Sequence, residues 1–227
     1  YTVWGDPVMG NGLRMRGELF NDESVQFMLK LGNVLDQYVW HVRHPRTYHL
    51  PYSPIVTAVQ HNAELAKRWD DKVMKSLDRF QGQRVVVTVK MDGMQSTLYK
   101  DYMHARTPDF KSDVTWTWLQ NFHKKFCYEI PEGWRLNVEN LWGSAGTAIK
   151  YSHLPLYTMA WMLWNDKNEC LSWDATVEWV SLFSEILKEA GVEKGLPLVP
   201  VLYDGIYDED KIKSLYQPTF NGDEMEG

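Results

Sequence analysis

The chain has 227 residues, of which 44% are hydrophobic and 14% aromatic, and this composition excludes an intrinsically disordered protein. No apolar run reaches the roughly 18 residues of a membrane-spanning helix, so we expect no membrane partner. Two cysteines, Cys127 and Cys170, are too few for a disulfide framework, which indicates a reducing compartment. The length is sufficient for a single domain with its own hydrophobic core.

Charge is distributed unevenly along the chain, although the formal net charge is only −6. Residues 61–150 carry 14 basic and 11 acidic side chains, whereas residues 151–227 carry 5 basic and 14 acidic ones. A protein that holds polyanions by bulk charge is normally basic over a whole face. We therefore expect any contact with nucleic acid to be local and to use the middle segment.

Helical and loop patterns occupy the first 80 residues. Residues 24–42 place apolar side chains at a helical period, and residues 44–54 contain three prolines, which indicates an ordered loop. Residues 61–80 interleave Lys, Arg, Asp and Glu, so we predict an exposed helical segment there.

Strand patterns begin at residue 84. Residues 84–90, RVVVTVK, are rich in β-branched side chains and lie between Gly82 and a turn signal at Asp92-Gly93. Residues 95–102 show the alternation of a second strand. We therefore predict a hairpin that turns at the Asp-Gly pair.

The C-terminal half adds one helix and three strands. Residues 174–190 form the clearest helical pattern, with Asp174 as the expected N-cap and Gly191 as the stop. The predicted strands are residues 135–141, 157–164 and 198–202, and the second of them is apolar enough to be buried on both faces. Together these elements predict an α+β fold with mostly antiparallel sheets flanked by helices, in a single domain over residues 1–227.

The chain is unusually rich in aromatic side chains, with 11 Trp and 12 Tyr. Such numbers indicate aromatic-lined surfaces or pockets in addition to a core. Trp116, Trp118, Trp134 and Trp142 could form a base-stacking platform, but we expect at least half of them to pack in the core.

The most informative chemical signal is a lysine at the end of the first predicted strand, in Lys90-Met91-Asp92-Gly93. We expect the buried strand to desolvate the Lys90 ammonium partly, which favours the neutral and nucleophilic amine. Asp92 is placed to orient it, and a turn at Gly93 permits close approach of a ligand to the backbone. The alternative is that the lysine is simply the first solvated residue after the strand.

Several further segments resemble sequence motifs that accompany such a lysine in a known protein family. Lys90-Met91-Asp92-Gly93 resembles the first motif of the covalent nucleotidyltransferases, and the later segments resemble, in order, the motifs of phage-type ATP-dependent RNA ligases. These segments are His104-Ala105-Arg106-Thr107, residues 131–142 (PEGWRLNVENLW), residues 151–164, residues 200–205 (PVLYDG) and Glu226-Gly227, with residues 48–54 (YHLPYSP) upstream. The resemblance covers residues 43–227.

The resemblance implies a nucleotidyltransferase domain of ATP-grasp-like architecture and a covalent mechanism. Lys90 would attack the α-phosphorus of ATP and form lysyl-AMP with the help of Mg²⁺ or Mn²⁺. The AMP would then pass to a 5′-phosphate, and a 3′-hydroxyl would displace it to join the ends. The implied roles are phosphate or nucleic-acid contact for Arg106, ribose hydrogen bonding for Glu139, adenine stacking for Trp161 or Tyr157, and metal binding near the lysine for Glu226, with Asp92 and Gly93 in the nucleotide site. Asp92 either assists the metal or has a purely structural place in the turn.

The implied partners are ATP and RNA ends, nicked or single-stranded, in the cytoplasm of a cell or of a phage-infected host. The oligomeric state stays open, as does the choice between an RNA ligase and a DNA-end ligase or another nucleotidyltransferase of the same fold.

Two departures from the family pattern keep a non-catalytic nucleotide-binding or interaction module as a further alternative. Asn137-Val138 stands where the family has a small residue and Gly before the glutamate, and the family's K-x-K motif does not occur by Gly227. We expect that motif, and any appended domain, to follow Gly227 in the complete protein.

Overall fold

The computed structural model describes residues 41–45, 47–68, 71–108, 113–143 and 148–227. Residues 42–227 form one compact unit. The helix predicted over residues 24–42 falls almost wholly outside the described residues. Within the described ranges, no helix is both long and apolar enough to cross a membrane.

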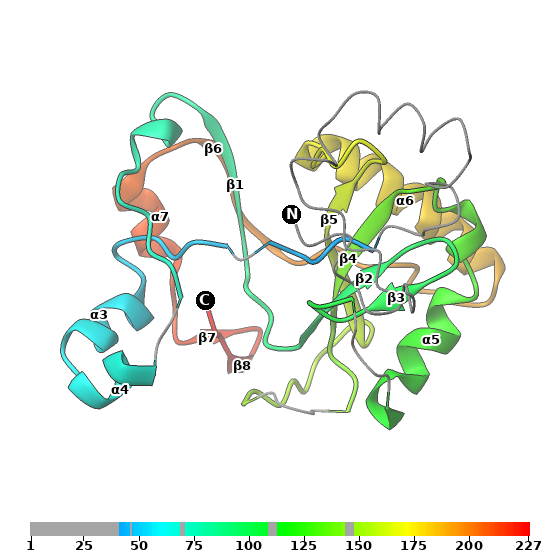
Figure 1. Cartoon of the computed structure of the whole chain (residues 1–227), viewed down its shortest axis with the longest axis horizontal. Helices are drawn as coiled ribbons and strands as arrows, with labels where there is room; N and C mark the ends of the chain where they lie inside the picture. The colour runs from blue at the N-terminus through cyan, green and yellow to red at the C-terminus, as the bar shows by residue number, and fades with distance from the viewer. Residues whose placement is uncertain (1–40, 46, 69–70, 109–112, 144–147) are drawn as a thin grey trace, which may run out of the picture. The chain divides into compact units, whose positions relative to one another are not determined.

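The largest sheet has four antiparallel strands in the order β3-β2-β4-β5 (Figure 1). Its strands are β2 (Met94–Leu98), β3 (Met103–His104), β4 (Arg135–Asn140) and β5 (Thr158–Trp164). The strands predicted at residues 135–141 and 157–164 are confirmed, and no residue of β5 is exposed. In the register of the sheet, Glu139 on β4 lies opposite Gln95 on β2 and opposite Met159 on β5.

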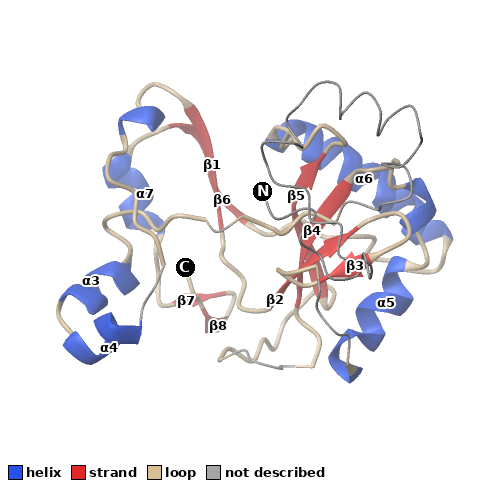
Figure 2. Cartoon of the chain, viewed as in Figure 1, coloured by secondary structure: helices blue, strands red, loops and turns tan. Residues whose placement is uncertain are grey.

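Alternation along β2 and β4 gives this sheet two different faces. Leu98, Leu136 and Val138 are fully buried and belong to a core that includes residues from α5 (Thr117–His123) and α6 (Trp173–Glu189) (Figure 2). Because successive side chains of a strand point to opposite faces, the residues between them point away from this core. Those residues are Gln95, Thr97, Asn137 and Glu139.

Helix α6 begins one residue earlier than the sequence predicts, and the predicted cap is wrong. Its N-cap is Ser172, whose hydroxyl oxygen accepts a hydrogen bond from the backbone N–H of Ala175 at 3.2 Å. Asp174 lies in the first turn, where its carboxylate pairs with Arg84 instead. Gly191 follows the helix with a φ of 81°, as expected for a glycine stop.

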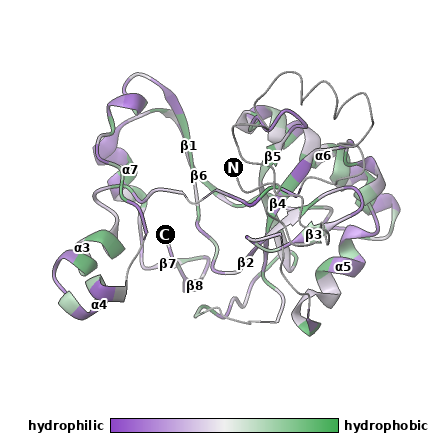
Figure 3. Cartoon of the chain, in the orientation of Figure 1, coloured by the Kyte–Doolittle hydropathy of each residue, from purple (hydrophilic) through white to green (hydrophobic). Residues whose placement is uncertain are grey.

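A second, two-stranded sheet consists of β1 (Arg84–Thr88) and β6 (Val201–Ile206), which are antiparallel. Figure 3 shows the hydrophobic residues of β1 in green. Arg84 donates hydrogen bonds to Asp204 on β6 at 2.7 Å and to Asp174 on α6 at 2.6 Å. This one guanidinium therefore ties the small sheet to the first turn of α6.

The hairpin predicted from residues 84–90 and 95–102 is wrong, because β1 and β2 belong to different sheets. Gly93 packs directly on β4, where a Cβ would lie 2.7 Å from the carbonyl oxygen of Asn140. β1 pairs instead with a strand more than a hundred residues further along the chain.

The segment before β6 joins the two sheets. Ala160 of β5 donates a backbone hydrogen bond to Pro197 and accepts one from Val199, and Pro200 accepts one from Val89. The strand predicted at residues 198–202 is therefore only partly correct, because β6 begins at Val201, which is exposed.

The remaining helices and strands are short. In the described part of residues 61–80, helical structure is limited to two short pieces, because residues 72–74 pair with His49 in an extended conformation. The other elements are α3 (Pro54–Gln60), α4 (Ala63–Arg68), α7 (Glu209–Leu215), β7 (Thr219–Phe220), β8 (Asp223–Glu224) and the 3₁₀ turns η4 (Asp78–Phe80), η5 (Val114–Trp116) and η6 (Cys127–Glu129).

Candidate functional site

Lys90 follows β1 at the point where the chain passes between the two sheets. Its neighbours Val89 and Met91 are buried in a second hydrophobic cluster, which also contains Met159, Val199 and Met225. The alternation of an extended chain turns Lys90 to the opposite side, where its side chain is 61% exposed. The expectation that burial desolvates the ammonium is therefore wrong, because Lys90 is anchored by its neighbours and remains open to solvent.

Glu226 is the carboxylate that contacts this lysine. Its side chain forms an ion pair with Lys90 Nζ. The backbone N–H of Lys90 also donates to the carbonyl oxygen of Gly227 at 2.6 Å, and Met225 is anchored in the cluster beneath. The structure thus brings together the two predicted residues that are furthest apart in the sequence.

Lys90 borders a cavity of about 420 Å³. Of the predicted site residues, Arg106, Glu139 and Trp161 also line this cavity. They come from the segment after β3, from β4 and from β5, so the cavity lies over the polar face of the four-stranded sheet. Val89 and Val199 add apolar surface to the cavity wall, and Thr88 at the end of β1 lies beside them.

Glu139 is the titratable group whose environment is most altered near Lys90. Burial is the main cause that raises the pKa of its carboxyl to about 8; nearby Glu226 and Asp92 add to the rise, and Lys90 and a hydrogen bond from the Gly93 backbone oppose it. At neutral pH this carboxyl therefore carries a proton and can donate as well as accept a hydrogen bond.

Gly93 is required by its packing against β4. A Cβ at this position would lie 2.8 Å from the side chain of Glu139 and 2.8 Å from that of Leu141. The glycine therefore permits the close approach that holds the Glu139 side chain in place. The predicted hairpin at this position is wrong, but the close packing on β4 explains why the residue is a glycine.

Asn137 and Val138, which stand where the family has a small residue and Gly, do not fill the cavity. Val138 is fully buried in the core on the other face of the sheet. The Asn137 amide donates to the Thr97 hydroxyl at 2.9 Å, within the polar face. This departure from the family pattern leaves Glu139 beside Lys90.

Trp161 forms a wall of the cavity together with His44. The two rings pack edge to face with centroids 4.9 Å apart. Tyr157, the alternative for adenine stacking, does not line this cavity and lies in a second one. Of the two alternatives, only Trp161 lines the cavity that contains Lys90.

Asp92 lies apart from the cavity that contains Lys90. One of its carboxylate oxygens accepts backbone hydrogen bonds from Ala148 at 2.7 Å and from Ile149 at 2.9 Å. Its own backbone N–H donates to the Tyr151 hydroxyl at 2.6 Å. These contacts favour the structural alternative for Asp92, since they hold the segment at residues 148–151 against the motif.

Several cavity residues were not predicted from the sequence as parts of this site, and two of them, His44 and Gln95, lie among its polar groups. His44 is 6% exposed, and neither ring nitrogen has a hydrogen-bond partner among the described residues. Burial, with Arg135 and Arg106 nearby, lowers the pKa of His44 to about 4, so the ring is neutral. The only available signal for Gln95 was the period-two alternation that places it on the same face as Glu139.

The arrangement suits chemistry at a phosphorus atom. It combines an accessible primary amine, a carboxylate in contact with that amine, a protonated carboxyl group, an aromatic wall and an arginine around one cavity. A nucleotide offers the matching groups, which are a base to stack, ribose hydroxyls and phosphates.

Comparison with protein families gives a match over most of the chain. The family model described as RNA ligase matches residues 83–227, a range that includes Lys90, Glu139 and Glu226. This match confirms the resemblance drawn from the motifs. A comparison with curated proteins finds no match.

Solved structures share the fold at low sequence identity. A point mutant of Naegleria gruberi RNA ligase with AMP and Mn superposes with a TM-score of 0.50 and 15% identity, over 82% of this chain and 52% of that chain. An apo point mutant of the same enzyme gives a TM-score of 0.50 and 16% identity, over 83% and 52%. The chain therefore spans about half the length of these structures, and the predicted α+β fold is confirmed.

Proposed function

The chain belongs to the RNA ligase family, and on this basis we propose that it is an ATP-dependent RNA ligase that joins a 5′-phosphate to a 3′-hydroxyl through lysyl-AMP. The observation that carries the proposal is the ion pair of Lys90 with Glu226 at the cavity that Glu139 and Trp161 line. The AMP and Mn bound to a related fold support the choice of nucleotide and metal.

Lys90 is the nucleophile in this proposal. Its Nζ attacks the α-phosphorus of ATP, a P–N bond forms, and the bond to the β-phosphate oxygen breaks to release pyrophosphate. The ammonium must lose a proton before it attacks. Because the Lys90 side chain is exposed, this proton passes to solvent, and the contact with Glu226 holds Nζ in position.

The nucleotide is held by residues on three sides of the cavity. Trp161 offers its ring to adenine, and the protonated carboxyl of Glu139 hydrogen-bonds the ribose hydroxyls. Arg106 offers a permanent positive charge to phosphate or to the nucleic-acid end. Lys90 then faces the α-phosphate between the sugar and the leaving group.

The donor set fits a metal that is bound largely through the nucleotide. Among the described residues, no group of three His, Cys, Asp or Glu side chains could hold a metal by itself. Mg²⁺ and Mn²⁺ bind in such sites through one or two carboxylates together with phosphates and water, and Glu226 is the carboxylate we assign. When bound, the metal offsets phosphate charge and orients the leaving group.

RNA ends are the acceptors in this proposal. The AMP passes from Lys90 to a 5′-phosphate, and attack by a 3′-hydroxyl on that activated phosphate forms the new phosphodiester and releases AMP. The two cysteines of the described residues are unpaired, which fits the reducing cytoplasm of a cell or of a phage-infected host.

Ligation by the purified full-length protein tests the acceptor. We expect ATP-dependent joining of 5′-phosphorylated RNA ends, with nicked RNA duplexes and single strands compared in parallel, and no joining by the Lys90→Ala variant. Joining of DNA but not of RNA would assign the domain to DNA ends. ATP binding, seen as a thermal shift, without joining of either substrate would indicate a non-catalytic module.

A further inference from the structure

An exposed aromatic pair lies beside the Asp92-Gly93 segment, outside the cavity assigned to the nucleotide. Trp142 is 38% exposed and Tyr157 is 44% exposed. Their rings meet edge to face with centroids 4.7 Å apart. Because these two exposed rings contact each other, they form a contiguous apolar surface, which is the kind of surface that marks a binding site.

A third aromatic ring and two backbone hydrogen bonds fix the positions of Trp142 and Tyr157. Trp118 lies nearly parallel to Trp142, with an interplanar angle of 22°, and contacts the edge of Tyr157. The backbone N–H of Trp142 donates to the Asn140 side chain at 3.1 Å, and the carbonyl of Tyr157 accepts from Leu141 at 2.9 Å. The rings are therefore fixed in advance, and a ligand that stacks on them loses little side-chain entropy.

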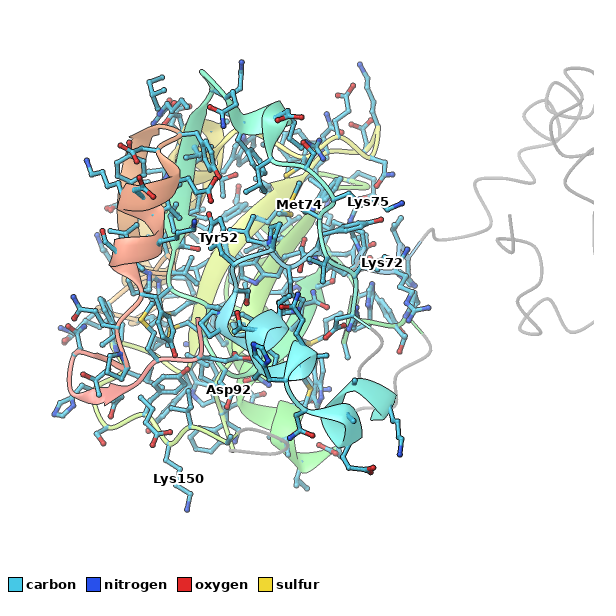
Figure 4. All side chains as sticks on the ribbon, turned by 90° about the vertical axis from the view of Figure 1, so that its left-hand side faces the viewer. Tyr52, Lys72, Met74, Lys75, Asp92 and Lys150 are labelled. Atoms are coloured by element: carbon cyan, nitrogen blue, oxygen red, sulfur yellow. The ribbon has the colours of Figure 1, made fainter. Side chains whose placement is uncertain are left out.

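The two rings line a second cavity of about 320 Å³ together with Asp92, Tyr151 and Lys150. Asp92 accepts two backbone hydrogen bonds there, whereas Lys150 forms no ion pair with any described residue. Figure 4 shows the Lys150 side chain extending outward from the edge of the protein. The cavity thus offers aromatic surface and one accessible positive charge.

The geometry points to a binding site for an unpaired nucleobase of the RNA strand, with the base stacked on Trp142, its edge against Tyr157, and an adjacent phosphate on Lys150. This inference rests on the proposed function. A flat base matches the exposed rings, and the phosphate matches the ammonium, so a nucleic-acid strand satisfies both parts of the surface. An apolar peptide would leave Lys150 unmatched.

The position of this site relative to Lys90 supports the assignment. Lys90 borders the nucleotide cavity, and Asp92, two residues further on, borders the aromatic one. A strand held on the aromatic pair is therefore brought next to the lysine that carries AMP. Stacking and phosphate contacts do not read the 2′-hydroxyl, so we expect this site to position an end without selecting RNA over DNA.

Binding of a fluorescein-labelled single-stranded RNA of about 12 nucleotides, measured by anisotropy with the full chain, tests the proposal. We expect Trp142→Ala to raise the Kd about tenfold and Trp142→Phe to raise it much less, since a ring remains. Lys150→Gln should lower the slope of log Kd against log salt by about 0.7, as for one lost phosphate contact. Tyr128→Ala is the matched control, because Tyr128 is 56% exposed and lines neither cavity.

Formation of lysyl-AMP by the same variants separates this proposal from the proposed function. We expect all of them to form it to the wild-type extent. If Trp142→Ala and Lys150→Gln bind RNA within about twofold of the Tyr128→Ala control, the aromatic site is wrong, whatever the state of adenylylation. Lys150 is exposed, so its variant reports on the site even if Trp142→Ala folds poorly.

Discussion

The Glu139→Gln substitution tests whether the carboxyl group beside Lys90 is protonated in the folded protein. Glutamine has the same shape as a protonated glutamate but cannot ionise. Burial raises the pKa of Glu139 from 4.5 to about 8, so between these values the folded protein keeps a proton that the unfolded chain has released. The wild-type protein must therefore lose stability as the pH rises through this window.

The size of the effect follows from linkage. Each pH unit in the window costs about 1.4 kcal/mol, which amounts to at most about 5 kcal/mol between pH 4.5 and pH 8. Above about pH 8 both states are ionised and the loss no longer grows. The Glu139→Gln variant should escape this loss, so its advantage over the wild type should increase by about 4 kcal/mol from acidic to mildly alkaline pH.

Urea unfolding of both proteins at about pH 5 and about pH 8.5 measures the effect. Other titrating groups, including His44, are common to the two proteins and cancel in the difference. Glu132→Gln is the control for the loss of a carboxyl group as such, because Glu132 is exposed. A Glu139→Gln advantage that is equal at the two pH values would refute the reasoning.

The motif around Lys90 gives two further predictions. Gly93→Ala should destabilise the fold by about 1–3 kcal/mol in urea unfolding and reduce lysyl-AMP formation, because the new methyl group meets the carbonyl of Asn140 at 2.7 Å. Gly82→Ala should cost stability through its φ of 71° without affecting adenylylation, since that position is open. Asp92→Ala should lower thermal stability by about 1–2 kcal/mol, and Asp92→Asn less, because the carboxylate holds two loop amides. A variant Asp92→Ala of wild-type stability that forms no lysyl-AMP would contradict the structural role.

The sequence was most informative where local pattern and packing agree. Residues 135–141 and 157–164 formed the expected strands because their apolar side chains face a core on at least one side. The hairpin prediction failed because an Asp-Gly pair is a signal for reversal only if the strands can pair with each other. Here Gly93 packs against β4, and β1 finds its partner in β6, a distant pairing that no local pattern encodes.

In the candidate site, too, local motifs predicted some residues, whereas other features depend on tertiary contacts. The motifs predicted Lys90 and Glu226 as site residues, and the structure brings the two together because their neighbours Val89, Met91 and Met225 share one hydrophobic cluster. His44 could not be predicted as a wall of the cavity, since its burial depends on tertiary contacts with Trp161. The exposure of the Lys90 side chain also depends on tertiary packing, which a strand pattern alone does not determine.

Covalent labelling of Lys90 tests the central claim most directly. The full-length protein is incubated with α-labelled ATP and Mg²⁺ or Mn²⁺, denatured, and analysed by electrophoresis and peptide mass spectrometry. We predict one AMP on Lys90, linked through the side-chain nitrogen, and no label on the Lys90→Ala variant. Absence of label from the wild type, or label retained by Lys90→Ala, would contradict the lysyl-AMP mechanism.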